Sequence, residues 1–154
     1  MLNSVSLDGT LLVDMLAETL EAMAFVSIAP TAPPHQFPAE ATRIRIGFSG
    51  PIRGTVELAT SRAFGRLLVS NVMDDVECSN CSITSADDAL KELLNIVCGS
   101  LLRKQSGSDN YDISLPTASP LLADSEWERF LGSDGTIIVD AEGYLIAGRV
   151  DVLA

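Results

Sequence analysis

The feature that most constrains this fold is a pair of long amphipathic helices, each predicted from apolar residues at helical spacing. The first spans about residues 9–27, and the second runs from about Ser85 to Gln105, with Thr84 or Ser85 as its N-cap. The apolar face of the first comprises Leu12, Met15, Leu16, Leu20, Met23 and Ala24, and that of the second comprises Leu90, Leu93, Leu94, Val97 and Cys98. Each helix must therefore pack one face against another layer of the protein.

Two β-hairpins are predicted to supply that layer. RIRIGF (43–48) alternates apolar and polar residues, and GTVELAT follows a GPIRG turn, so residues 41–60 are predicted to form the first hairpin. GTIIVD and GYLIAGRVDV form the second hairpin across an AEG turn, and YDISLP is a short strand ended by Pro116. A Pro-rich connection follows the first helix and is too donor-poor for a helix or a central strand.

The order of these elements predicts the fold class. A shorter helix with Ser61 as its N-cap follows the first hairpin, and a small helical piece around Trp127 precedes the second. Helices followed by antiparallel strands indicate an α+β domain with two long amphipathic helices packed on an antiparallel β-sheet. We expect a single domain over 1–154, with pseudo-repeat halves of about 9–73 and 84–154.

Composition limits the possible partners. A hydrophobic fraction of 47% with 20% charged residues is typical of a globular protein, and the net charge is −11. That charge argues against binding to nucleic acid or to an anionic membrane. The apolar start of the chain is interrupted by acids, and the first basic side chain is Arg43. We therefore expect no signal peptide and a cytoplasmic location.

A narrow polar stripe on the second helix is the candidate site. At about 100° per residue, Asp88, Glu92, Asn95 and Gly99 fall at about 0°, 40°, 340° and 20°. A solvated helix face is the simpler explanation for the two acids. Asn followed by Gly one turn later favours a site, because both residues weaken a helix and neither aids solubility. Gly99 is expected to leave open space beside the amide.

The same segment resembles a family signature. The segment resembles the motif of the CheC/CheX/FliY family of chemotaxis phosphatases through DALKELLN (88–95), then Gly99, a polar break and DISLP (112–116). The order of the predicted elements is similar to the CheX branch of that family. That motif is Asp or Ser, three residues, Glu, two residues, Asn, and a Pro a little over twenty residues later. The interval from Asn95 to Pro116 is slightly shorter than usual.

The resemblance implies hydrolysis of the aspartyl phosphate of a CheY-like response regulator receiver domain, in chemotaxis or other two-component signalling. Asn95 is expected to orient the attacking water, and Glu92 to accept a hydrogen bond or ion pair from the receiver's lysine. Asp88 is expected to shape the helix surface, and Pro116 to fix a strand end. No cofactor of its own is implied, since the receiver carries the divalent metal. The alternative is a non-catalytic CheX-like adaptor that binds a signalling or flagellar-motor partner.

The first helix carries a similar stripe with one difference. Asp14 and Glu18 match the spacing of the second helix, but Glu21 stands where the family's Asn would be. A carboxylate repels a phosphoryl group and donates no hydrogen bond, so this stripe is predicted to be inactive. The resemblance also implies a homodimer, and the apolar closing hairpin is the predicted contact because open strand edges invite pairing.

Other constellations are weaker. Cys78 and Cys81 form a lone CxxC, and a zinc site needs about two more ligands. His35, the only histidine, is expected to be a surface loop residue. GFSGPIRG lacks the Lys–Ser/Thr ending of a phosphate-binding loop. Cys98, together with Trp127 and Phe130, is expected to belong to the core.

Overall fold

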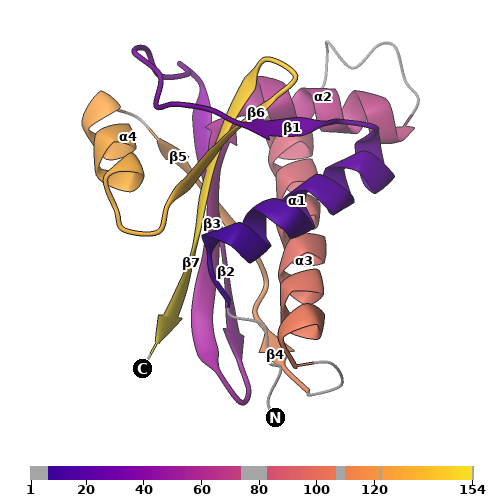
Figure 1. Cartoon of the computed structure of the whole chain (residues 1–154). Helices are drawn as coiled ribbons and strands as arrows, with labels where there is room; N and C mark the ends of the chain where they lie inside the picture. The colour runs from indigo at the N-terminus through magenta and orange to yellow at the C-terminus, as the bar shows by residue number, and fades with distance from the viewer. Residues whose placement is uncertain (1–6, 74–82, 107–109, 122, 154) are drawn as a thin grey trace.

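The computed structural model describes residues 7–73, 83–106, 110–121 and 123–153. The helices described are α1 (Gly9–Ala24), α2 (Arg62–Met73), α3 (Ile83–Ser106) and α4 (Asp124–Leu131). The strands described are β1 (Ile28–Pro30), β2 (Ala41–Ser49), β3 (Arg53–Ser61), β4 (Asp112–Ile113), β5 (Thr117–Leu121), β6 (Ile137–Ala141) and β7 (Tyr144–Leu153). Figure 1 shows how these elements are arranged.

The described strands form one antiparallel sheet in the order β1-β6-β7-β3-β2-β4, with β5 also pairing with β2. The two predicted hairpins, β2–β3 and β6–β7, are both present. They meet in the middle of the sheet, where β3 pairs with β7 and Leu58 lies opposite Gly148. The two halves of the chain therefore share one sheet, and the predicted α+β fold is confirmed.

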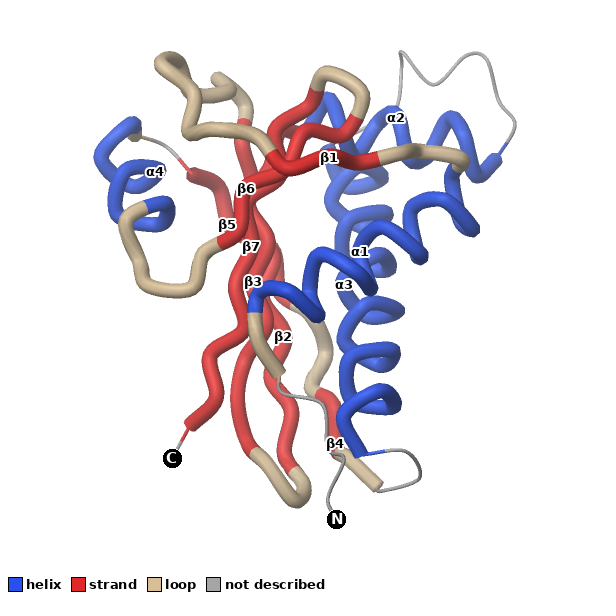
Figure 2. The backbone as a smooth tube through the Cα atoms, in the orientation of Figure 1, coloured by secondary structure: helices blue, strands red, loops and turns tan. Residues whose placement is uncertain are grey.

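The sheet has helices on both faces. α1, α2 and α3 lie on one side of the strands and α4 lies on the other (Figure 2). The larger core lies between the three helices and the sheet and includes Leu12, Leu16, Ile44, Leu58, Leu90, Leu93 and Leu94. The smaller core lies under α4, where Trp127 and Phe130 pack with Ala59 and Ala147. Burial of Trp127 and Phe130 confirms their predicted core role.

Close packing against α2 fixes the start of α3. A Cβ atom on Gly65 would lie 2.7 Å from the carbonyl oxygen of Ala86, so only glycine permits the two helices to approach this closely. Beside this contact, Arg62 Nε lies 3.5 Å from Asp87 Oδ1. The first turn of α3 is thus positioned by the close backbone approach at Gly65 and by the ion pair between Arg62 and Asp87.

Helix boundaries differ slightly from those predicted. α1 ends at Ala24 rather than near 27, because Phe25 adopts a left-handed conformation (φ 58°) and donates its N–H to the Glu21 carbonyl. The Ser61 N-cap is confirmed, since Phe64 N–H donates to Ser61 Oγ at 3.2 Å. α3 begins at Ile83, so Thr84 and Ser85 lie inside the helix and the prediction that one of them is the N-cap is wrong.

Two edge strands were not predicted. β1 lies at the start of the Pro-rich connection, and β5 begins directly after Pro116, while β4 is shorter than the predicted strand over YDISLP. Both unpredicted strands contain proline, Pro30 and Pro120, which removes a backbone donor. Proline is tolerated here because, within the described segments, β1 pairs only with β6 and β5 only with β2.

The closing hairpin is not the open edge that was predicted. β7 lies inside the sheet and pairs with β3, while its residues 144–148 also pair with β6. Only 149–153 have no described neighbour on the β6 side. The homodimer stays a prediction, and this short free edge is the part of the hairpin left to form it.

Candidate functional site

The predicted stripe lies on the solvent side of α3. Its side chains Asp88, Glu92 and Asn95 are exposed, and Gly99 is half-buried; we call these four residues the α3 stripe. The opposite face carries Leu90, Leu93, Leu94, Val97, Cys98, Leu101 and Leu102, all in the larger core. Because the apolar face is fully buried, α3 cannot rotate, and the stripe is fixed in place on the surface.

The polar groups of the stripe are available to a partner. Asp88 lies 4.0 Å from Lys91 Nζ, a weak contact between exposed charges. Among the residues that the structure describes, Glu92 and Asn95 have no hydrogen-bond or ion-pair partner for their side chains. A carboxylate and an amide therefore stand one turn apart with their hydrogen-bonding capacity unused.

Arg103, which sequence reasoning missed, fills the space predicted beside the amide. Its Nη1 atom lies 3.3 Å from the position that a Cβ atom on Gly99 would occupy. Its Nη2 atom donates to Ser100 Oγ at 3.1 Å. The guanidinium thus lies back over Gly99, one turn from Asn95, so the expected open space is occupied. The available signal was the i, i+4 spacing of Gly99 and Arg103, since helical side chains lean toward the N-terminus.

A groove borders the stripe where α1 packs against α3, and Figure 2 shows the two helices on one side of the sheet. It has a volume of about 550 Å³. Its lining comprises Met15, Glu18, Thr19, Ala22 and Met23 from α1 and Ile96, Ser100, Arg103 and Lys104 from α3. The groove therefore has a partly apolar lining, with basic side chains from α3 and one acid from α1.

The stripe on α1 (Asp14, Glu18 and Glu21) is exposed as well. Glu18 lines the groove together with Ile96, which directly follows Asn95 on α3, so the two stripes flank the same groove. No amide accompanies these three carboxylates, since Glu21 takes the position that Asn95 has on α3. The α1 stripe therefore offers acceptors but no donor for a phosphoryl oxygen or a water molecule.

Pro116 and Cys98 have surroundings that suit structural roles. Pro116 is half-buried between β4 and β5, both of which pair with β2, and is not part of the α3 stripe. Cys98 is fully buried, and burial raises the pKa of its thiol to about 12. The thiol therefore stays protonated at neutral pH, and the prediction that it acts as a small hydrophobe is confirmed.

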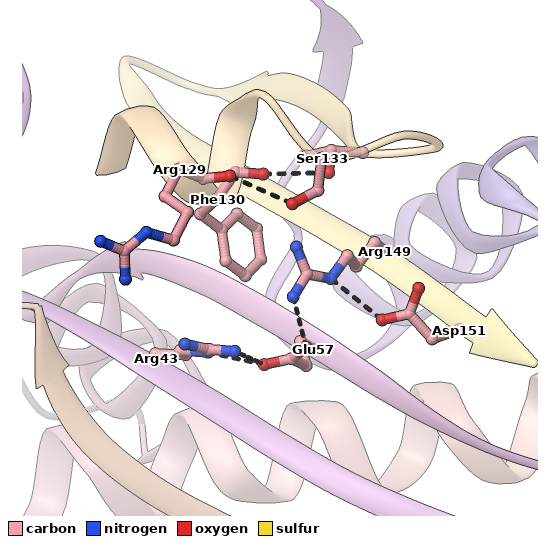
Figure 3. A network of polar contacts seen from close by, with 8 residues as sticks. Arg43, Glu57, Arg129, Phe130, Ser133, Arg149 and Asp151 are labelled. Carbon is pink, nitrogen blue, oxygen red and sulfur yellow. Dashed lines mark hydrogen bonds and ion pairs between the residues drawn. The ribbon is translucent and has the colours of Figure 1, made fainter. Parts of the chain in front are cut away.

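A second polar cluster lies on the other face of the sheet, beneath α4 (Figure 3). Glu57 has only 3% of its side chain exposed and pairs with both Arg43 and Arg149. Arg149 Nε also bonds Asp151 at 3.1 Å, and the two guanidinium carbons lie 5.6 and 4.7 Å from the centre of the Phe130 ring. Two positive and two negative charges balance here, so each charged member of this cluster has a partner of opposite charge.

The rival sites gain no support. His35 is an exposed loop residue, as predicted. Cys78 and Cys81 lie outside the described residues. Within the described part of the chain, no group of three or more His, Cys, Asp or Glu side chains is arranged to hold a metal ion. No described helix has the length and apolar character needed to cross a membrane.

Comparison with protein families identifies the class. The model described as "Chemotaxis phosphatase CheX" matches residues 43–119, half of the chain, and includes Glu92, Asn95 and Pro116. The chain therefore belongs to the CheX family. No curated protein matches its sequence significantly.

Solved structures share the fold at low sequence identity. The CheX protein of Vibrio vulnificus is 16% identical with a TM-score of 0.69, and the match covers 94% of this chain and 95% of the other. A CheX–CheY–BeF3–Mg²⁺ complex from Borrelia burgdorferi matches at 15% identity and a TM-score of 0.62, over 97% of this chain and all of the other. FliY of Thermotoga maritima matches at 16% identity and a TM-score of 0.61, over 93% and 87%.

Proposed function

We propose that this chain is a phosphatase that hydrolyses the aspartyl phosphate of a CheY-like receiver domain. The observation that carries this function is the exposed pair Glu92 and Asn95, which a fully packed helix presents to solvent without described partners. Membership of a phosphatase family supports it. A structural neighbour captured with CheY, BeF3 and Mg²⁺ supports the class of partner.

The reaction needs little from the phosphatase. The acyl phosphate is already held by the receiver's own divalent metal and lysine, so the missing component is a positioned water molecule. The Asn95 amide enters beside the phosphoryl group and orients water for in-line attack. The bond between phosphorus and the aspartate oxygen breaks, and the products are a free aspartate and inorganic phosphate.

Glu92 has a different task from Asn95. It accepts a hydrogen bond from the receiver's lysine and so sets the register of α3 against the receiver. A charge-assisted contact of this kind is stronger than a neutral hydrogen bond. Asp88 and Gly99 shape the helix surface around the pair, and Pro116 holds the edge strand.

The test measures the rate at which a phosphorylated receiver loses its phosphate, using the receiver encoded nearest to this chain. The phosphatase is present at a small fraction of the receiver concentration. Faster decay over many turnovers supports hydrolysis by this chain. If the receiver binds but loses its phosphate at the intrinsic rate, the adaptor function replaces the phosphatase function.

A further inference from the structure

An exposed isoleucine lies directly beside the proposed catalytic amide. Ile96 follows Asn95, stands four residues after Glu92, and has 38% of its surface exposed, although the other large apolar side chains of α3 between Leu90 and Leu102 are buried. Its side chain is part of the groove between α1 and α3. Neither the core of the protein nor the water-positioning chemistry explains an exposed isoleucine at this place.

The groove is built to accept an apolar side chain. Met15 and Met23 of α1 line it together with Ile96. Methionine side chains are flexible and polarisable, and they adapt to the shape of a bound partner. A volume of about 550 Å³ lies in the range of ordinary ligand sites and accommodates a large side chain.

Basic side chains border the same groove. Arg103 and Lys104 line it against a single acid, Glu18, and neither basic side chain forms an ion pair with a carboxylate in the described residues. Both lie in the last turn of α3, where positive charge also favours the helix dipole. The dipole does not account for the placement of Arg103, whose guanidinium reaches back over Gly99 toward Asn95. In a chain of net charge −11, this basic border selects an acidic partner surface.

We propose that this groove is a second contact for the receiver, in which Ile96 packs against an apolar side chain while Arg103 pairs with a neighbouring carboxylate. This role rests on the proposed function, because the receiver must already lie against Glu92 and Asn95. The groove sets which receiver is bound, whereas the amide performs the chemistry. Ile96 and Arg103 are thus specificity residues and not catalytic ones.

Two substitutions test the groove, and each has a control. Ile96→Ser removes the apolar contact at nearly unchanged helix propensity, and Arg103→Glu reverses the charge. Arg129→Glu is the control for charge, since Arg129 is also exposed in the last turn of its helix but lies on α4, across the sheet (Figure 3). Leu115→Ser is the control for an exposed apolar residue on a segment outside the groove.

Binding is measured with the receiver loaded with beryllofluoride, and the decay rate is measured separately at saturating phosphatase. We expect Ile96→Ser to weaken binding by roughly tenfold while the saturating rate stays within about twofold. We expect Arg103→Glu to slow association several-fold at low salt and to approach wild type at high salt. Both controls should bind like wild type, and thermal melts verify that every variant is folded.

Three outcomes overturn the role of the groove. It fails if folded Ile96→Ser and Arg103→Glu bind like wild type, or if the controls weaken binding equally. It also fails if Ile96→Ser lowers the saturating rate but not the affinity, because the side chain then acts on the chemistry. These outcomes differ from failure of the proposed function, in which the unsubstituted protein does not accelerate decay at all.

Discussion

α1 and α3 carry similar exposed stripes on the same side of the sheet, but they differ at one position. Asp14, Glu18 and Glu21 on α1 are all carboxylates, whereas the matching third residue on α3 is the amide Asn95. A carboxylate only accepts hydrogen bonds and repels a phosphoryl group, while an amide both donates and accepts. The two stripes thus share their spacing along the helix and differ by a single hydrogen-bond donor, which the proposed function makes the decisive difference.

The largest effect is expected where α3 loses that donor. Asn95→Ala should reduce accelerated decay by about 10²–10³, the usual cost of removing a preorganised donor. Its melting temperature should be unchanged or slightly higher, because Asn95 is exposed and alanine has the higher helix propensity. Steady-state turnover of the phosphorylated receiver and a thermal melt provide both measurements.

Two variants control this prediction. Asn95→Asp gives α3 the carboxylate chemistry of α1 and should also be inactive. Glu21→Ala alters the matching position on α1 and should leave turnover unchanged. If Asn95→Asp keeps wild-type turnover, the difference between the two stripes lies elsewhere.

Glu92→Ala should act on binding as well as on turnover. Its proposed partner is the receiver's lysine, and a hydrogen bond to a charged group contributes about 1.5–3 kcal/mol. The dissociation constant for a beryllofluoride-loaded receiver should therefore rise roughly 10- to 100-fold. Glu92→Gln keeps a hydrogen-bond acceptor but removes the charge, so its dissociation constant should lie between those of wild type and Glu92→Ala. Unchanged affinity in both variants would assign Glu92 some other role.

Glu18→Ala should have little effect, although Glu18 matches Glu92 in position. Glu18 has no amide beside it to orient water, so turnover at saturating phosphatase should stay within about twofold, a change of about 0.5 kcal/mol that is usual for an exposed side chain. Glu18 also lines the groove, where removal of one border charge changes encounter rates more than chemistry. A loss as large as that of Glu92→Ala would show that α1 is a working site.

The smallest effect is expected from metal removal. If the α1 stripe bound a divalent cation, the metal would stabilise the folded state and raise the melting temperature. We expect the same melting temperature in chelator and in excess Mg²⁺ for the isolated protein. A rise with Mg²⁺ that Glu18→Ala removes would instead make α1 a metal site.

Sequence periodicity predicted the elements whose burial is one-sided. α1, α3 and β2 follow apolar spacing closely, because each buries mainly one face in the larger core. β3 and β7 bury both faces, with Leu58 and Ile146 against the helices and Ala59 and Ala147 under α4. β1 and β5 were missed because their prolines argue against strands, and only the neighbouring β6 and β2 make them possible. The position of β7 inside the sheet was missed because it depends on pairing with β3, which is distant in sequence.

Some features of the candidate site were predictable from the sequence and others were not. The α3 stripe follows from helical phase, so its exposure was predictable. The placement of Arg103 was missed, although its i, i+4 spacing from Gly99 was a usable signal. The bond to Ser100 that holds the guanidinium there does not follow from helical phase. The groove was also unpredictable, since it exists only where α1 packs against α3.

The most direct test of the central claim is the decay rate of a phosphorylated receiver at saturating phosphatase, with affinity measured separately on the beryllofluoride-loaded receiver. We predict that wild type accelerates decay strongly. Asn95→Ala should bind with an affinity within a few-fold of wild type, yet leave the receiver close to its intrinsic decay rate. The account is contradicted if saturating Asn95→Ala accelerates decay as wild type does, or if saturating wild type does not accelerate it.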